Sequence, residues 1–248
     1  MIDRNLSHWY PEIEKQARSF FSYCLDFFFP PRCVYCHTMG NRICAVCASV
    51  IPWIDSNHCR FCGLPQAEIR SHHCIDRARI QFVRSAAVFS GPIRKALHAL
   101  KYDSDRSLAA QLVSLSHPHW ALPTWDFDAL LPVPLGRDRE RARGYNQSLL
   151  LANALSRLVP IPVAAGCLSR VRETQTQVGL SFGARQQNMA NAFQASAVEG
   201  KRVLLVDDVC TTGATLQSCA EALVHAGARG VGALTLARAV LPASRLGT

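Results

Sequence analysis

The chain has 248 residues, of which 49% are hydrophobic, and this can fill the core of one large domain or of a medium domain with a small appendage, which excludes a disordered protein. Lysine and arginine number 27 against 18 aspartate and glutamate, so the formal net charge is +9 and the pI is about 9.2. Such a surface attracts anions, and charge alone does not choose among nucleic acid, phosphorylated metabolites and acidic lipids.

The N-terminal segment contains the apolar run FFSYCLDFFF at residues 20–29. Asp26 interrupts this run and it is too short to span a bilayer, so we expect no membrane insertion. A long polar stretch precedes the run, and Pro30, Pro31 and Arg32 follow it, which does not fit a secretory signal peptide. These features predict a cytoplasmic protein.

Seven of the 11 cysteines lie in one stretch, residues 33–74. In a reducing compartment, clustered cysteines are better interpreted as metal ligands than as disulfides. Three pairs (CVYC, CAVC and CRFC) have the Cys-x-x-Cys spacing that lets a tight turn aim two thiolates at one tetrahedral zinc ion. The candidate ligands are Cys33, Cys36, Cys44, Cys47, Cys59, Cys62 and Cys74.

Where a fourth pair is expected, the sequence reads SHHC at residues 71–74. Imidazole nitrogen also binds zinc, so His72 is an eighth candidate ligand, although either histidine could equally be a surface residue. Spacing does not decide whether the pairs close sequentially or interleave. The end of the cluster predicts a boundary near residue 78, with a zinc-binding module at 1–78 and a second domain at 79–248.

After the cysteines, short apolar segments alternate with segments of helical periodicity, which predicts an α/β fold with a mostly parallel sheet. A polar segment without periodicity covers 168–183, and a basic loop precedes the helix at 144–158. The predicted strands are 83–89, 127–134, 202–208 and 231–239. The predicted helices are 91–102, 107–115, 144–158, 184–193 and 214–227.

The segment KRVLLVDDVCTTGATLQS, residues 201–218, predicts the binding site. Asp207 and Asp208 lie at the carboxyl end of a strand, where parallel sheets bind ligands, and the following turn leads into a helix whose first amides attract a phosphate monoester. Two adjacent carboxylates can accept hydrogen bonds from vicinal hydroxyls or hold a water-ligated magnesium ion. Together these groups match a ribose 5-phosphate.

Two other interpretations of this segment are weaker. In a receiver domain the acidic pair opens the domain, whereas here it lies close to the end of the chain. Helix capping alone would account for single aspartates and threonines. A pair of carboxylates followed by Thr-Thr-Gly-Ala-Thr is more than a cap requires.

RVLLVDDVCTTGAT resembles the phosphoribosyl pyrophosphate (PRPP) signature of type I phosphoribosyltransferases, and further segments resemble the ComF family of competence-associated proteins. The similarity runs from about residue 25 to 239. It implies a type I phosphoribosyltransferase domain with a flexible hood loop, preceded by a double zinc ribbon. The segments that carry it are CVYC, CAVC, LKY (100–102), LLPVPL (130–135), RARGYNQ (141–147) and SRVRETQTQVGLSFGARQQNMANAF (169–193).

The resemblance implies a role for each matching position. Asp207 and Asp208 would bind the ribose hydroxyls, with Mg²⁺ accompanying PRPP and Zn²⁺ structural in the ribbon. The loop for the 5-phosphate would comprise Cys210, Thr211, Thr212, Gly213, Ala214 and Thr215. The pyrophosphate loop would comprise Pro132, Val133, Pro134, Leu135 and Gly136, with Arg143 nearby. The hood would carry Arg172, Thr174, Gln177, Arg185 and Asn188.

Two functions follow from the resemblance. One is an enzyme that transfers phosphoribose to an unidentified acceptor and releases pyrophosphate. The other is a PRPP-responsive accessory protein without catalysis, which binds single-stranded DNA or a helicase partner during DNA uptake, and either could form a homo-oligomer. Basic residues beside aromatics, such as Arg143 and Tyr145, are the pattern that stacks bases, but they are few.

Overall fold

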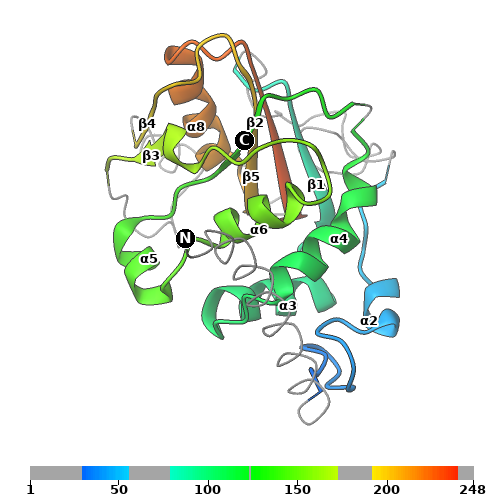
Figure 1. The fold of residues 1–248 in the computed structure, drawn as a ribbon. Coiled ribbons are helices and arrows are strands. Elements are labelled where there is room, and N and C mark those ends of the chain that lie inside the picture. Colours follow the sequence, from blue (N-terminus) through cyan, green and yellow to red (C-terminus); the bar gives the residue numbers. More distant parts are fainter. Residues whose placement is uncertain (1–29, 56–78, 123, 173–191, 240–248) are drawn as a thin grey trace, which may run out of the picture.

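A computed structural model describes residues 30–55, 79–122, 124–172 and 192–239. Its centre is a sheet of four strands in the order β1-β6-β5-β2, in which every neighbouring pair is parallel (Figure 1). The fold class is therefore the predicted one. The strands are β1 (Phe82–Val88), β2 (Ala129–Pro132), β5 (Arg202–Cys210) and β6 (Gly230–Arg238).

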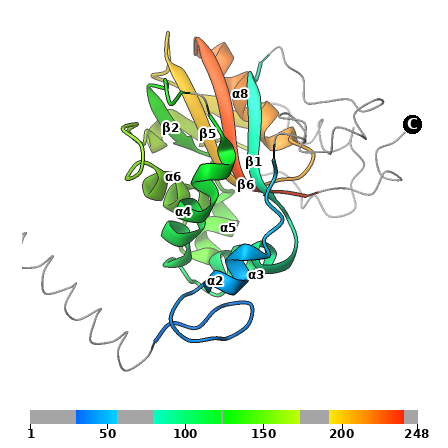
Figure 2. The ribbon, with the colours of Figure 1, turned by 90° about the vertical axis from the view of Figure 1, so that its right-hand side faces the viewer.

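Helices cover both faces of this sheet, because alternate residues of the central strands point into two separate cores. Leu204 and Val206 of β5 pack with the helices α3, α4 and α6, whereas Val203 and Leu205 pack with α8. Figure 2 shows how these helices are arranged around the sheet. The helices are α2 (Ala45–Ser49), α3 (Gly91–Tyr102), α4 (Leu108–Trp120), α5 (Arg137–Arg143), α6 (Gln147–Leu155), the 3₁₀ turn η2 (Ala165–Cys167) and α8 (Ala214–His225).

Among the helices, α5 and α4 differ most from the sequence prediction. The basic segment before α6 is a short helix, α5, rather than a loop. Its two acidic residues lie in the first turn and two of its four arginines, Arg141 and Arg143, in the last, which suits the helix dipole; Gly144 ends the helix at φ 78°. Helix α4 continues past the predicted end at residue 115. There Trp120 is buried and its Nε1 donates to the carbonyl oxygen of Thr235 at 2.8 Å, which ties the end of α4 to β6.

The cysteine segment packs directly on the rest of the chain. Cys33, Ile43, Cys47 and Ile51 are buried in the same core as α3 and α4. Residues 52–54 also run along the edge of β1, where the amide of Ile54 donates to Ala86 O at 2.8 Å. The boundary near residue 78 stays a prediction, because residues 56–78 lie outside the described part of the chain.

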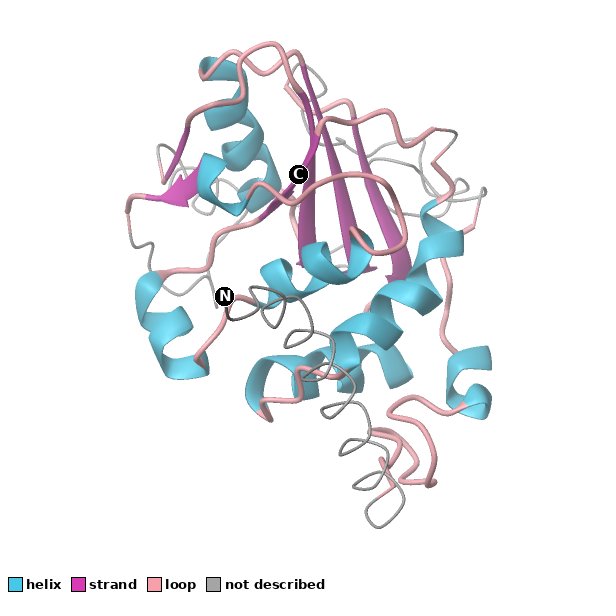
Figure 3. Cartoon of the chain, viewed as in Figure 1, coloured by secondary structure: helices cyan, strands magenta, loops and turns pink. Residues whose placement is uncertain are grey.

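A second, two-stranded antiparallel sheet, β3 (Leu168–Arg170) with β4 (Phe193–Ala195), lies beside α8 (Figure 3). Residues 173–191, which join these two strands, lie outside the described residues, and so does most of the predicted helix at 184–193. No helix in the described part of the chain has the length and apolar character needed to cross a membrane.

Candidate functional site

The candidate site lies at the carboxyl edge of the main sheet, where β2 ends beside the last residues of β5. Pro132 of β2 pairs with Val206 of β5, so the loop after β2 begins next to Asp207 and Asp208. Strand β5 extends to Cys210, two residues beyond the predicted end, and the loop to α8 follows it. The parallel topology therefore brings the segments predicted to bind ribose, phosphate and pyrophosphate to one edge of the sheet.

Asp207 is held by two hydrogen bonds to one carboxylate oxygen. Its Oδ1 accepts from the Ser148 hydroxyl at 2.8 Å and from the backbone amide of Asp208 at 2.9 Å. Ser148 is fully buried in the first turn of α6, a turn that Asn146 caps by accepting from the Ser148 amide at 2.9 Å. These bonds fix the orientation of the carboxylate relative to the sheet edge.

Asp208 is paired with a lysine that the residue patterns did not single out. Its side chain is buried, and its Oδ2 lies 2.8 Å from Nζ of Lys101 in the last turn of α3. The two neighbouring carboxylates therefore have different partners, a hydroxyl for Asp207 and an ammonium group for Asp208. The available sequence signal was the LKY segment at 100–102, which contains this lysine but does not reveal its partner.

The surroundings of Asp207 make it less acidic than an ordinary aspartate. Loss of solvent, and then the negative charge of Asp208, raises the pKa of Asp207 to about 7, although the hydrogen bond from Ser148 and the nearby Lys101 act in the opposite direction. Asp207 therefore changes its charge close to neutral pH. A ligand that donates hydrogen bonds or carries a cation to this edge stabilises the ionised form.

The loop between β5 and α8 presents an open helix N-terminus. Gly213, at φ 83°, occupies the N-cap position, and no side chain there caps the helix. The amide of Ala214 has only a long contact of 3.4 Å with the Thr212 hydroxyl. The first intrahelical bond runs from the Gln217 amide to Gly213 O, which leaves the earlier amides without an intrahelical acceptor. A phosphate group is the ligand that such a turn accepts.

Cys210 does not share that open environment. It is buried and accepts a hydrogen bond from Nη1 of Arg238, at the end of β6. Burial raises the pKa of its thiol despite this arginine, so a neutral thiol is favoured. The predicted phosphate loop is therefore divided, with Cys210 inside the protein and Thr211 exposed.

The predicted pyrophosphate loop is anchored from both sides. The Val133 amide donates to Val206 O at 3.0 Å, and the Val133 carbonyl accepts from Nδ2 of Asn146 at 3.0 Å. Residues 134–136 then lead into α5. Arg143, in the last turn of α5, donates to Gln147 Oε1 and lies over the ring of Tyr102, 5.5 Å from its centroid. This guanidinium group is thus tied to both α6 and α3.

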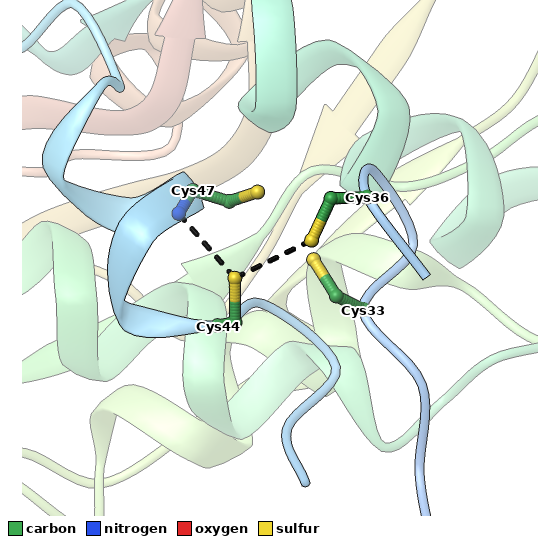
Figure 4. A group of neighbouring side chains, drawn as sticks. All are labelled: Cys33, Cys36, Cys44 and Cys47. Atoms are coloured by element: carbon green, nitrogen blue, oxygen red, sulfur yellow. Dashed lines mark hydrogen bonds between the residues drawn. The ribbon is translucent and has the colours of Figure 1, made fainter. Parts of the chain in front are cut away.

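Four of the predicted zinc ligands converge. The sulfur atoms of Cys33, Cys36, Cys44 and Cys47 all lie within 4.8 Å of one another, and those of Cys36 and Cys44 are 3.5 Å apart (Figure 4). Four thiolates bound at about 2.3 Å to one tetrahedral zinc ion lie about 3.8 Å apart, so this cluster fits zinc. The first two pairs close sequentially, which resolves for these residues the alternative that spacing left open.

The local backbone explains why these sulfurs meet. The Cys33 amide donates to Thr38 O at 2.8 Å, which closes a tight turn, and Cys44 caps α2 by accepting from the Cys47 amide at 3.4 Å. Hydrogen bonds, first from the side chain and backbone of Thr38, lower the pKa of Cys36 to about 6. This lowered pKa favours the thiolate of Cys36, whereas burial raises the pKa of the Cys47 thiol in the same cluster.

Several predicted residues cannot be placed. The candidate ligands Cys59, Cys62, His72 and Cys74 lie outside the described residues, as do Thr174, Gln177, Arg185 and Asn188 of the predicted hood. Arg172 is described and follows β3, at the point where the described chain stops. The roles predicted for all of these positions stay predictions.

Known protein families match both the sheet domain and the cysteine segment of this chain. A phosphoribosyl transferase domain model matches residues 146–242, and a double zinc ribbon domain model matches residues 24–77. Competence protein F of Haemophilus influenzae is 33% identical over 233 residues, which cover 86% of this chain and 99% of the relative. The chain belongs to the ComF family.

Other relatives are similar over most of their length. The DNA utilization protein YhgH of Escherichia coli is 31% identical over 205 residues, or 79% of this chain and 90% of the relative. The competence protein ComFC of Bacillus subtilis is 28% identical over 209 residues, or 80% and 85%. The domain matches and the parallel sheet confirm that this ComF chain combines a type I phosphoribosyltransferase fold with a zinc-ribbon module.

Proposed function

We propose that the chain binds PRPP with Mg²⁺ at the carboxyl edge of the sheet and transfers its phosphoribosyl group to a nitrogen nucleophile. The observation that carries this proposal is the juxtaposition of the Asp207 and Asp208 pair with the uncapped first turn of α8. A pair of acceptors for vicinal hydroxyls beside an anion-binding turn is complementary to a ribose 5-phosphate. The phosphoribosyl transferase domain match supports the same ligand.

In this proposal each part of the edge has one task. Asp207 and Asp208 accept hydrogen bonds from the two ribose hydroxyls, and the amides before Gln217 bind the 5-phosphate. The loop at 132–136 lies against the diphosphate, with Arg143 within reach from α5. Mg²⁺ bound with PRPP would neutralise charge on the leaving diphosphate.

The proposed reaction is a displacement at the anomeric carbon. The bond from this carbon to the diphosphate oxygen breaks with its electron pair leaving on oxygen, while the acceptor nitrogen forms the new bond and releases a proton to solvent. The ribose is positively charged at the transition state, so two nearby carboxylates stabilise it, and the reaction depends on positioning more than on a strong base.

A second candidate function has its own support. The net charge is +9, and Tyr102 is an exposed aromatic side chain with the Arg143 guanidinium over its ring. Cationic groups beside an exposed ring are typical of surfaces that bind single strands. Since relatives carry names that refer to competence and DNA utilization, the alternative is an accessory protein of DNA uptake that binds PRPP without turnover.

One experiment tests the proposal and separates the two functions. Calorimetric titration with Mg²⁺ and PRPP should give binding to the wild type, and Asp207→Asn/Asp208→Asn should weaken it at least about tenfold, because ionised acceptors are lost. Wild-type protein that does not bind PRPP would remove the proposal. Pyrophosphate release with added amines would support the transferase, whereas PRPP binding without release, together with salt-sensitive binding of single-stranded DNA, would favour the accessory protein.

A further inference from the structure

Lys101 connects the end of α3 to Asp208 of the candidate PRPP site. Its ammonium group lies 2.8 Å from Oδ2 of Asp208, and the two side chains are 21% and 6% exposed. A carboxylate this deeply buried needs a counter-ion to remain charged. If Asp208 accepts a ribose hydroxyl, as the proposed function has it, Lys101 is the counter-ion that holds this acceptor in place.

The end of α3 determines where Lys101 lies. The Leu100 carbonyl accepts a hydrogen bond from the buried Tyr145 hydroxyl. Arg106, just after α3, donates to Gly144 O at 3.3 Å and lies over the Tyr145 ring, 4.5 Å from its centroid. The turn from α3 to α4 is thus fastened to the start of α6, on the side of the candidate site.

The same turn is fastened on its other side to the cysteine module. Asp105, which is only 9% exposed, forms an ion pair with Arg42 and accepts from the Ser107 hydroxyl at 2.5 Å. Arg42 is two residues before the predicted zinc ligand Cys44, and the backbone of the intervening Ile43 forms two hydrogen bonds with Gln111 of α4. That glutamine accepts from the Ile43 amide at 2.9 Å and donates to the Ile43 carbonyl at 2.7 Å.

We infer that Lys101 is a positioning residue of the PRPP site and that Arg42 of the cysteine module holds it there through Asp105. The inference rests on the proposed function. The folded cysteine module then raises the affinity of the site for PRPP. It does so from a distance, since none of its described residues lies at the carboxyl edge of β5.

The effect of Arg42 on Lys101 passes through Asp105. Without Arg42, this buried carboxylate loses its charged partner, and the chain relieves the cost by moving the α3–α4 turn toward solvent. Lys101 lies in the last turn of α3, four residues before Asp105, so the movement draws its ammonium group away from Asp208. Asp208 then loses the counter-ion that holds its carboxylate in place, and the ribose loses a positioned acceptor.

The test is PRPP affinity measured by calorimetry on the full chain, with zinc content determined on the same samples. Arg42→Met should raise the Kd for PRPP about 5- to 20-fold, the range of ordinary coupling between sites, without loss of zinc. Arg32→Met is the matched control, because Arg32 is exposed in the same module and forms no ion pair within the described residues; its Kd should equal that of the wild type. Arg42→Lys should restore most of the affinity.

A double-mutant cycle distinguishes positioning from general loosening. Lys101→Met should weaken PRPP binding at least as much as Arg42→Met, and Lys101→Arg should retain binding. Lys95→Met, a charge change on the exposed side of the same helix, should have no effect. Arg42→Met added to Lys101→Met should cause no further loss, because the only route of its effect has been removed.

The outcomes separate this inference from the proposed function. Wild-type protein that fails to bind PRPP removes the proposed function itself. Wild-type binding together with unchanged affinity of Arg42→Met overturns the inference alone, and so do additive effects in the cycle. If Arg42→Met loses zinc, the deciding variant is Asp105→Asn, which breaks the same ion pair from outside the cysteine module. Unchanged PRPP affinity of Asp105→Asn overturns the inference. A loss of affinity comparable to that of Arg42→Met, with full zinc content, supports it.

Discussion

At the scale of single residues, Asp207 illustrates a conflict between binding and stability. Burial and the charge of Asp208 raise its pKa to about 7 from an ordinary value of 3.8, so the folded state binds its proton more tightly than the unfolded state. The folded state is therefore not penalised below about pH 4, and it loses stability as the pH rises toward 7 and this half-buried carboxyl group ionises. A carboxylate that costs stability is retained where a ligand needs it.

Asp207→Asn should for this reason stabilise the protein at pH 8 while it abolishes the proposed ribose contact. The asparagine Oδ1 can still accept from Ser148 and from the Asp208 amide, so packing is preserved. We expect a gain on the order of 2 kcal/mol at pH 8, or about 2–4 °C in Tm for each kcal/mol, and none at pH 4. Thermal unfolding at both pH values measures it.

Asp138→Asn is the control for this substitution, because Asp138 lies on α5 with 83% of its side chain exposed. Its Tm relative to wild type should not change with pH. A Tm of Asp207→Asn that is equal to or below that of the wild type at pH 8 would show that the carboxylate is not strained in the folded protein.

At the scale of elements, the turn between β5 and α8 depends on a glycine. Gly213 has φ 83°, a conformation that an L-residue with a Cβ adopts only at a cost. Gly213→Ala should destabilise the fold by about 1 kcal/mol, seen as a lower urea midpoint, and weaken PRPP binding because the first amides of α8 turn away from the phosphate. Gly166→Ala is the matched control, since a Cβ there meets no atom within 4 Å; equal urea midpoints for the two variants would contradict the prediction.

The periodic elements could be predicted because burial dictates their patterns. Strands β5 and β6 read as continuous apolar runs since both faces are covered, and α3 has its predicted ends, Gly91 and Tyr102. Helix α5 was missed because it has no buried residue, so no apolar periodicity marks it. The end of α4 was missed because Pro118 signals a stop that the burial of Trp120 overrides.

Local motifs indicated where the candidate site would lie, but not which side chains would orient its residues. Each predicted segment, 132–136 and 207–215, is a short continuous stretch whose residue types indicate its proposed chemistry. The partners that orient them come from elsewhere: Ser148 is 59 residues from Asp207, and Lys101 is on a different helix altogether. Nothing in either local sequence specifies such a pairing, because it is created only when the sheet and its helices assemble.

At the scale of the whole molecule, the cysteine cluster and the phosphoribosyltransferase fold share one core. Cys33 and Cys47 are buried among the side chains of α3 and α4, so the metal-binding turns cannot loosen without exposing apolar surface of the main domain. An appended module connected only by a linker would unfold separately. Here the two parts should unfold together.

Removal of zinc should consequently lower the stability of the entire chain. We expect a strong chelator to reduce Tm by about 6–12 °C, which corresponds to a loss of about 3 kcal/mol, with a single calorimetric transition before and after. Cys44→Ser should have the same effect without chelator, and Cys167→Ser, a half-buried cysteine outside the cluster, should not. A second, separate transition of low Tm, with the main one unchanged, would show instead that the cysteine module folds on its own and that its contacts with α3 and α4 contribute little to the stability of the sheet.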